Sequence, residues 1–291
     1  MPDLIEITSG QLSAAINPLG AELTHLRDLQ GRELMTDADP RWWTGHAPIL
    51  FPVVGRPNGD VIRLDGIEYA MKQHGFARRL MFELVEHEVG RALFRLTDSE
   101  DTRAVYPFAF ALEIEFVLDG PALAINVRIV NRGDAVMPAS FGFHPAFAWP
   151  LPYGEPRDAH RIVFEAEEPG ALKEIVPGGQ IGTAERPSPL DGRTLPLRDE
   201  LFTHDALIWD PVHSRRVTYG APTGPQLDVA FPDTSKLGIW TKPGAHYVCI
   251  EPWHGIADTE GFTGDFRDKP GVFEIAPHGD WHCTLHVTLR I

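Results

Sequence analysis

Alternation of apolar and polar residues with a period of two is the pattern that most constrains the fold of this chain. Residues 108–118 place Phe, Leu and Ile on one face and Glu113 and Glu115 on the other. Residues 123–129 and 283–291 alternate in the same way, and Asp-Gly-Pro at 119–121 separates the first two segments. This period is typical of half-buried β-strands, so the first two segments are expected to form a hairpin.

Glycine and proline, 27 and 26 residues, are scattered between the alternating segments, as a chain with many turns requires. No segment of more than a few turns has helical periodicity. We expect the Pro- and Gly-rich residues 169–196 to form long surface loops, because strand-like sequence resumes on both sides. The pattern predicts an all-β fold, a single domain over residues 1–291 built as one large antiparallel β-sandwich.

The composition, with 43% hydrophobic and 23% charged residues, is that of an ordinary globular protein. A net charge of −15 disfavours nucleic acid and anionic lipid as partners. Cys249 and Cys283 are too few for a disulfide framework or a structural zinc site. The first residues lack a basic region followed by an apolar one, and no apolar run reaches the roughly 18–20 residues of a membrane helix. We therefore expect a cytoplasmic protein without a membrane partner; the sequence indicates no oligomeric state.

Three short segments combine titratable residues with Gly, Pro and aromatic residues: 72–79 (KQHGFARR), 140–147 (SFGFHPAF) and 249–258 (CIEPWHGIAD). A weaker fourth is 204–210 (HDALIWD). Taken singly, a histidine beside glycine is usually an ordinary loop residue, and one among aromatic rings is usually part of the core. Taken together, the segments supply the acids, guanidinium groups and aromatic faces that bind sugar hydroxyls and C–H faces. A lectin or a glycoside hydrolase would share this composition.

In this order, HGFARR, FGFHPAF and IEPWHG resemble the aldose 1-epimerase (galactose mutarotase) family, in the bacterial branch with HGFAR and EPW signatures. The resemblance extends from the early PILFPVVGR segment to IEPWHG. It implies a β-sandwich of the supersandwich type, with a cleft on one sheet. The implied activity interconverts the α and β anomers of a free aldose. No cofactor or metal is needed, because a base and an acid only move protons.

The resemblance also implies roles for individual residues. Glu251 falls at the position of the base that takes the proton from the C1 hydroxyl. His144 falls at the position of the acid that protonates the ring oxygen. His74 matches the second family histidine, which hydrogen-bonds the region of that oxygen.

Four further residues are expected to bind substrate. Arg56 and Asp205 match family positions that hold sugar hydroxyls. Arg78 is expected to orient the site or bind substrate, and Trp253 to shape the cleft. The small-molecule partner implied is therefore a sugar.

The sequence departs from the galactose-specific members, which carry an Asn-His pair at the acid and Glu-Thr-Gln at the base. Galactose is therefore not implied as the substrate. Sugar phosphates are an alternative, since Arg56, Lys72, Arg78 and Arg79 are candidate phosphate ligands. The acidic charge balance favours neutral aldoses. A non-catalytic carbohydrate-binding protein on the same fold is the other alternative.

Other chemistries fit less well. His278, His282 and His286 recur every four residues, but the segment alternates as a strand, which would place the last two about 13 Å apart at ~3.3 Å per residue. No G-x-S-x-G motif of a serine hydrolase is present. A glycosidase needs two carboxylates. Glu251 with Asp205 or Asp258 would supply them, but that assignment leaves both site histidines unexplained.

Overall fold

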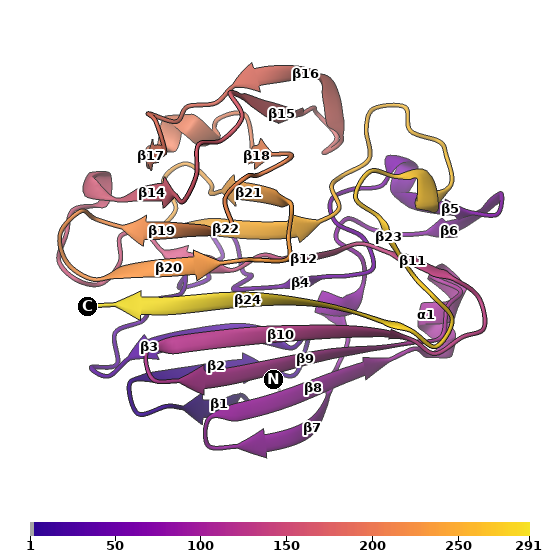
Figure 1. Cartoon of the computed structure of the whole chain (residues 1–291), viewed down its shortest axis with the longest axis horizontal. Helices are drawn as coiled ribbons and strands as arrows, with labels where there is room; N and C mark the ends of the chain where they lie inside the picture. The colour runs from indigo at the N-terminus through magenta and orange to yellow at the C-terminus, as the bar shows by residue number, and fades with distance from the viewer. Residues whose placement is uncertain (1–2) are drawn as a thin grey trace.

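The computed structural model describes residues 3–291 and confirms the all-β prediction (Figure 1). Over these residues the largest sheet has nine antiparallel strands, in the order β17 (Thr194–Pro196), β14 (Arg161–Phe164), β19 (Arg216–Gly220), β20 (Gln226–Ala230), β24 (Asp280–Arg290), β10 (Ala122–Asn131), β9 (Phe110–Asp119), β8 (Arg91–Thr97) and β7 (Glu83–Glu88).

A second sheet carries the cavity described below. Its strands follow the order β16 (Ile181–Pro187), β15 (Ala171–Ile175), β18 (Leu207–Trp209), β21 (Lys236–Trp240), β22 (Tyr247–His254), β12 (Phe141–Phe143) and β4 (Ile49–Leu50), and β13 (Ala146–Ala148) also pairs with β22.

Smaller elements complete the described part of the chain. The remaining strands are β1 (Ile5–Thr8), β2 (Leu12–Asn17) and β3 (Glu22–Asp28) in one sheet, and the pairs β5 (Val61–Leu64) with β6 (Ile67–Ala70) and β11 (Met137–Ala139) with β23 (Phe273–Ile275). The helical segments are α1 (Glu100–Val105) and 3₁₀ turns at Asn58–Asp60, Ala77–Arg79, Arg157–Ala159, Asp199–Phe202 and Phe266–Asp268. None of these helices has the length and apolarity needed to cross a lipid bilayer.

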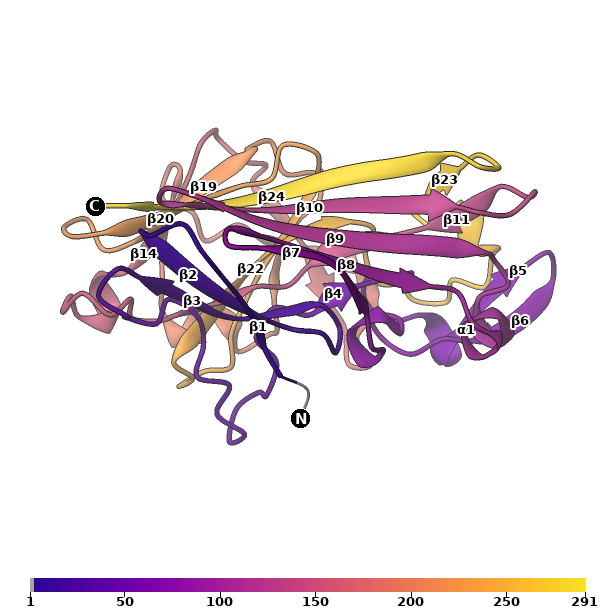
Figure 2. The ribbon, with the colours of Figure 1, turned by 90° about the horizontal axis from the view of Figure 1, so that it is seen from below.

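The two large sheets pack as a sandwich. Figure 2 shows β24, β10, β9 and β8 as one layer, with β22, β4 and β1–β3 on one side of it. Phe116 and Ile125 of the nine-stranded sheet share a buried cluster with Val248 and Ile250 of β22. The core therefore lies between the sheets, as expected for aligned β-sandwich packing.

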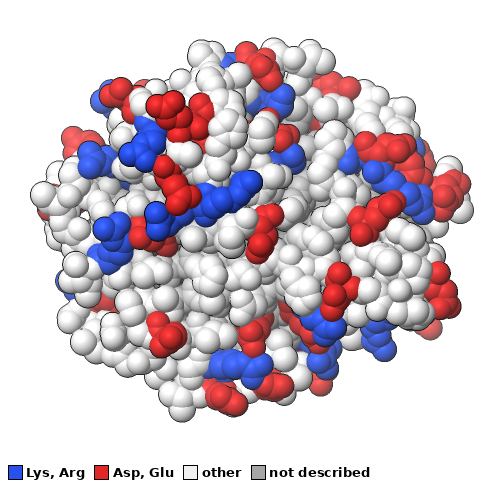
Figure 3. Space-filling model, in the orientation of Figure 1, with Lys and Arg blue, Asp and Glu red and all other residues white. Residues whose placement is uncertain are grey.

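The predicted hairpin is confirmed, because Ala122 pairs with Asp119 and the chain turns through Gly120, whose φ is +52°. Outward-facing Glu113 and Glu115 of this hairpin pair with arginines of β8. Figure 3 shows basic and acidic side chains intermixed on this face of the molecule. Such exposed pairs contribute about 0–1 kcal/mol each. The face carries no extended basic surface.

The C-terminal segment is a strand, as predicted. Cys283 and Leu285 face the core, whereas His282 and His286 are exposed on the other face of β24. His278 lies in the preceding turn, with Nε2 3.0 Å from a carboxylate oxygen of Asp134.

The expectation of surface loops over residues 169–196 is wrong. This region contains β15 and β16, an antiparallel pair at the edge of the second sheet, and β17 at the edge of the first. These edge strands leave many side chains partly exposed. They therefore lack the buried alternation by which the other strands are recognised.

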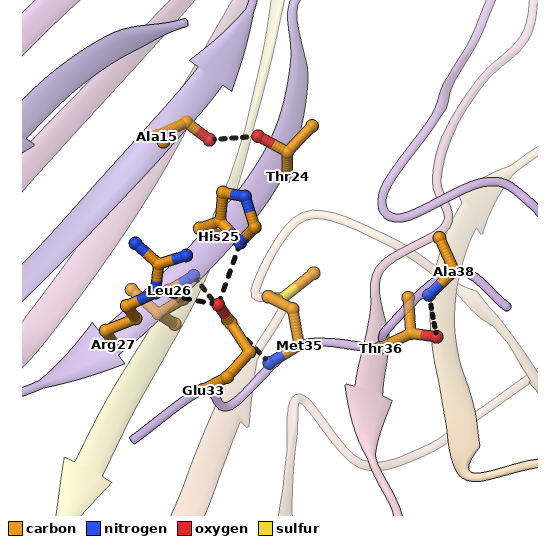
Figure 4. A network of polar contacts seen from close by, with 9 residues as sticks. All are labelled: Ala15, Thr24, His25, Leu26, Arg27, Glu33, Met35, Thr36 and Ala38. Atoms are coloured by element: carbon orange, nitrogen blue, oxygen red, sulfur yellow. Dashed lines mark hydrogen bonds and ion pairs between the residues drawn. The ribbon is translucent and has the colours of Figure 1, made fainter. Parts of the chain in front are cut away.

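Glu33 fixes the segment that follows β3 (Figure 4). Its Oε1 accepts hydrogen bonds from the backbone N–H groups of Leu26 (3.0 Å) and Met35 (3.2 Å). Its Oε2 lies 3.0 Å from Nε of Arg27 and 2.8 Å from Nδ1 of His25. After this segment the chain continues to Trp42 and Trp43, and Trp43 lines the cavity described below.

Candidate active site

Strand β22 forms one wall of a cavity of about 270 Å³. Its side chains alternate: Val248 and Ile250 enter the sandwich core, while Glu251 and Trp253 line the cavity. The polar residues that line the cavity are Gln73, His74, Arg78, His144, Asp205 and Glu251. Six of the seven residues predicted from the sequence, all except Arg56, are thus brought together.

Two glycines on the strands beside β22 make room for the ring of Trp253. A Cβ atom at Gly238 of β21 would lie 2.4 Å from the indole, and one at Gly142 of β12 would lie 2.6 Å from it. Real Cβ atoms do not approach so closely, so both positions require glycine. The indole is therefore held flat across the sheet beside Glu251.

Glu251 and His144 form a buried pair. Nε2 of His144 lies 3.2 Å from Oε2 of Glu251, and the two side chains are 10% and 2% exposed. His144 lies in the short connection between β12 and β13. The carbonyl of Pro145 accepts a hydrogen bond from the N–H of Ile250 (3.1 Å), which ties this connection to β22.

His74 is held by a left-handed backbone conformation, with φ at +65°. Its N–H donates to the carbonyl of Gly55 (2.9 Å), and the N–H of Gly55 donates to Nδ1 of His74 (3.2 Å). A backbone N–H only donates, so Nδ1 must be the acceptor and the neutral ring carries its proton on Nε2. The rings of His74 and His144 meet edge to face, with centroids 5.8 Å apart.

Two tryptophans that the sequence reasoning missed stand against His144. The ring centroids of Trp43 and Trp240 lie 4.9 Å and 6.0 Å from that of His144. A Cβ atom at Gly45 would lie 2.4 Å from the Trp43 indole, so this glycine lets the ring fold back. For Trp43, the glycine two residues later was a local sign in the sequence that the ring can pack back against the chain.

Burial favours the neutral form of both Glu251 and His144. It raises the pKa of Glu251 well above its ordinary value, and the nearby charge of Asp205 adds to this shift. Burial lowers the pKa of His144 to about 3. It also lowers the pKa of His74 well below its ordinary value. The favoured state therefore has a protonated Glu251 facing an unprotonated Nε2 of His144.

Arg78 and Asp205 complete the polar lining. Nη2 of Arg78 donates to the carbonyl of Gln73 (3.1 Å), and burial lowers the pKa of Arg78 to about 10, so it stays cationic at neutral pH. Asp205 adopts a left-handed conformation, with φ at +68°, and its Oδ1 accepts from the N–H of Ala206 (2.7 Å).

Arg56 is not brought into the cavity lining. Its Nε and Nη2 atoms lie 2.9 Å and 3.2 Å from the carboxylate oxygens of Asp60, four residues later. Its Nη1 donates to the carbonyl of Gly178 (3.2 Å). The expected contact of Arg56 with sugar hydroxyls is not supported by this placement.

The chain is similar to several known proteins in sequence and in fold. Protein LacX (chromosomal) of Lactococcus lactis subsp. lactis is 30% identical over 283 residues, covering 94% of this chain and 95% of that protein. The structure of a galactose mutarotase related enzyme from Lactobacillus acidophilus matches with a TM-score of 0.91 and 30% identity, over 99% of this chain and 98% of that one.

A galactose mutarotase-like protein from Lactobacillus casei also matches with a TM-score of 0.91, at 26% identity, over 99% of this chain and 100% of that one. The sequence matches the aldose 1-epimerase family over residues 3–268. This match includes all three motif segments. The chain therefore belongs to the aldose 1-epimerase family.

Proposed function

We propose that this protein interconverts the α and β anomers of a free aldose by acid–base ring opening and closure. The observation that carries the proposal is the 3.2 Å contact between His144 and Glu251, buried in the wall of a cavity of about 270 Å³. Cavities for small molecules span roughly 300–1,000 Å³, and this one lies just below that range, so it suits only a small ligand. A monosaccharide is such a ligand.

Ring opening requires one proton to leave the C1 hydroxyl and one to reach the ring oxygen. Transfer of the shared proton from Glu251 to His144 gives a carboxylate and an imidazolium 3.2 Å apart. The carboxylate takes the C1 hydroxyl proton while the imidazolium protonates the ring oxygen, and the bond between C1 and that oxygen breaks. Rotation about C1–C2 and the reverse transfers close the other anomer, so no proton is gained or lost overall.

The other lining residues have supporting roles in this proposal. His74 is neutral with its proton on Nε2, which lies 3.2 Å from the side-chain amide of Gln73. In this proposal the ring oxygen replaces that amide as the partner of the N–H, and His74 does not compete for the transferred proton. Trp43 and Trp253 offer apolar faces to the C–H groups of the sugar. Arg78 and Asp205 bind hydroxyl groups.

A neutral aldose fits the charges of the cavity better than a sugar phosphate. Of the four cations that the sequence offers as phosphate ligands, only Arg78 lines the cavity, and Glu251 and Asp205 line it too. A phosphate dianion prefers several converging cations without acidic groups beside them. We therefore propose a neutral aldose, rather than a sugar phosphate, as the substrate.

The direct test is a panel of pure anomers, neutral aldoses and their 6-phosphates, followed by polarimetry and by NMR exchange. We expect saturable acceleration above the spontaneous rate for at least one neutral aldose, with less for its phosphate. Binding of sugars without acceleration of any of them would establish the alternative, a carbohydrate-binding protein, and end the enzyme proposal.

The dependence of rate on pH is a second prediction. The reaction needs one proton on the Glu251–His144 pair. Burial raises the pKa of Glu251 and lowers that of His144, which moves the two apparent pKa values of the pair apart. We expect kcat/KM to be flat through neutral pH and to fall as pH rises through the upper value, where the pair loses its proton. At low pH the pair binds a second proton, and no group is then left to accept the proton of the C1 hydroxyl, so kcat/KM falls there too.

The profile is measured from pH 5 to 9 after subtraction of the catalysis by buffer and hydroxide. A rate that climbs steadily with pH through this range would mean that the acid is not needed, and would contradict the shared-proton mechanism.

A further inference from the structure

A free thiol lies beside the proposed acid–base pair. Cys249 precedes Glu251 by two residues on β22, so both side chains leave the same face of the strand. Cys249 is fully buried. One ligand atom each of His144, Cys249 and Glu251 lie within 4.8 Å of one another. Neither the acid–base mechanism nor the family motifs use this thiol.

The three groups have the chemistry and spacing of a divalent-metal site. Zinc binds thiolate at about 2.3 Å and imidazole or carboxylate at about 2.0–2.2 Å, so tetrahedral ligands stand roughly 3.3–3.6 Å apart. Nε2 of His144 and Oε2 of Glu251 are already 3.2 Å apart. Because the sulfur of Cys249 lies within 4.8 Å of both atoms, a shift of at most about 1.5 Å brings the thiol into the same geometry. His144 and Glu251 also line the cavity, which leaves a fourth ligand position open towards it.

The second nitrogen of His144 indicates what kind of metal site this is. Among the described residues, its buried Nδ1 has no hydrogen-bond partner. Histidines in sites built for a resident metal almost always donate their other ring N–H to a neighbouring acceptor, which fixes the ring and strengthens the ligand. The ring of His144 is packed against Trp43 and Trp240 but lacks this second hydrogen bond, so its ligand nitrogen is not prepared as in a site for a resident metal. The arrangement therefore suits a reversible inhibitor better than a permanent cofactor.

We propose that His144, Cys249 and Glu251 form an inhibitory site for a thiophilic divalent cation such as Zn²⁺ or Cd²⁺. Coordination replaces the thiol proton and the proton shared by the pair, and both are released to solvent. The bound ion occupies the two groups that must exchange protons with the sugar. Metal binding is independent of the proposed function, whereas inhibition rests on it.

The test uses reduced protein treated with chelator. Titration with Co²⁺ is expected to produce a thiolate-to-cobalt charge-transfer band at a stoichiometry of one, and calorimetry with Zn²⁺ to give the same stoichiometry. Cys249→Ser is expected to remove the band and to weaken Zn²⁺ binding at least tenfold. Cys283→Ser is the matched control, because Cys283 is the other buried free thiol and lies on β24. It is expected to bind both metals as the unchanged protein does.

Zn²⁺ is also expected to inhibit anomer interconversion by the unchanged protein and by Cys283→Ser, with recovery on adding EDTA. Cys249→Ser, compared with its own metal-free rate, is expected to need at least tenfold more Zn²⁺. Equal Zn²⁺ binding by both variants would place the metal elsewhere, for example on surface histidines, and overturn the proposal, as would no cobalt band. Should Cys249→Ser fail to fold, Glu251→Gln serves instead, with weaker Co²⁺ binding expected.

The two proposals fail in different ways. A protein that shows the cobalt band but accelerates no aldose keeps the metal site and loses the proposed function. A protein that accelerates an aldose but binds no Co²⁺ or Zn²⁺ keeps the function and loses the metal site.

Discussion

Glu251→Gln is expected to lower kcat for anomer interconversion by about 10²–10⁴-fold, the usual contribution of a positioned proton-transfer group. Glutamine has the same shape and can still hydrogen-bond His144, whose Nε2 lies 3.2 Å from the carboxylate in the unchanged protein. It cannot accept the proton of the C1 hydroxyl. Binding of the sugar should change much less than kcat. The measurement is the initial rate of polarimetric change with a pure anomer of the best aldose from the panel.

The matched control is Glu33→Gln. Like Glu251, Glu33 contacts a histidine ring; it accepts hydrogen bonds from backbone N–H groups and does not line the cavity (Figure 4). We expect this variant to keep its kcat and to lose thermal stability. Nearly unchanged kcat in Glu251→Gln, or an equal loss in Glu33→Gln, would remove Glu251 from the mechanism.

The fold was predictable from the sequence where one face of a strand is buried and the other is exposed to solvent. The alternation in β9, β10 and β24 follows directly from that asymmetry. It fails for β15 and β16, which lie at a sheet edge and have few buried side chains. Their pairing depends on each other and on β18, and no local pattern reports it.

The site was predictable only in part, for a similar reason. The motif segments could be found because each carries a titratable residue beside glycine or proline. Trp43 and Trp240 reach His144 from a distant loop and from β21, so only the folded chain brings them together. A family motif likewise does not predict the ion pair between Arg56 and Asp60, in which the guanidinium group lies outside the cavity lining. A motif identifies residue types, whereas the contacts that orient them are long-range.

His144→Asn is expected to lower kcat by about 10²-fold or more, because asparagine keeps a hydrogen-bond donor but delivers no proton to the ring oxygen. His74 cannot replace it, since Glu251 contacts the ring of His144 and can supply it with a proton, whereas the ring nitrogens of His74 contact the Gly55 N–H and the Gln73 amide. His160→Asn is the matched control: His160 is also buried, but it binds the N–H of Leu151 through Nε2 (3.0 Å) outside the cavity. It should keep its kcat, and an unchanged kcat in His144→Asn would exclude His144 as the acid.

Combining Glu251→Gln with His144→Asn tests whether the two residues act as one unit. If one proton serves both, then either single change removes the relay, and the double variant should be about as slow as the slower single variant. If the residues act independently, the two reductions should multiply. The shared buried position, 3.2 Å apart, favours the first result. A multiplicative loss would separate the acid from the base and leave the contact between them without a catalytic role.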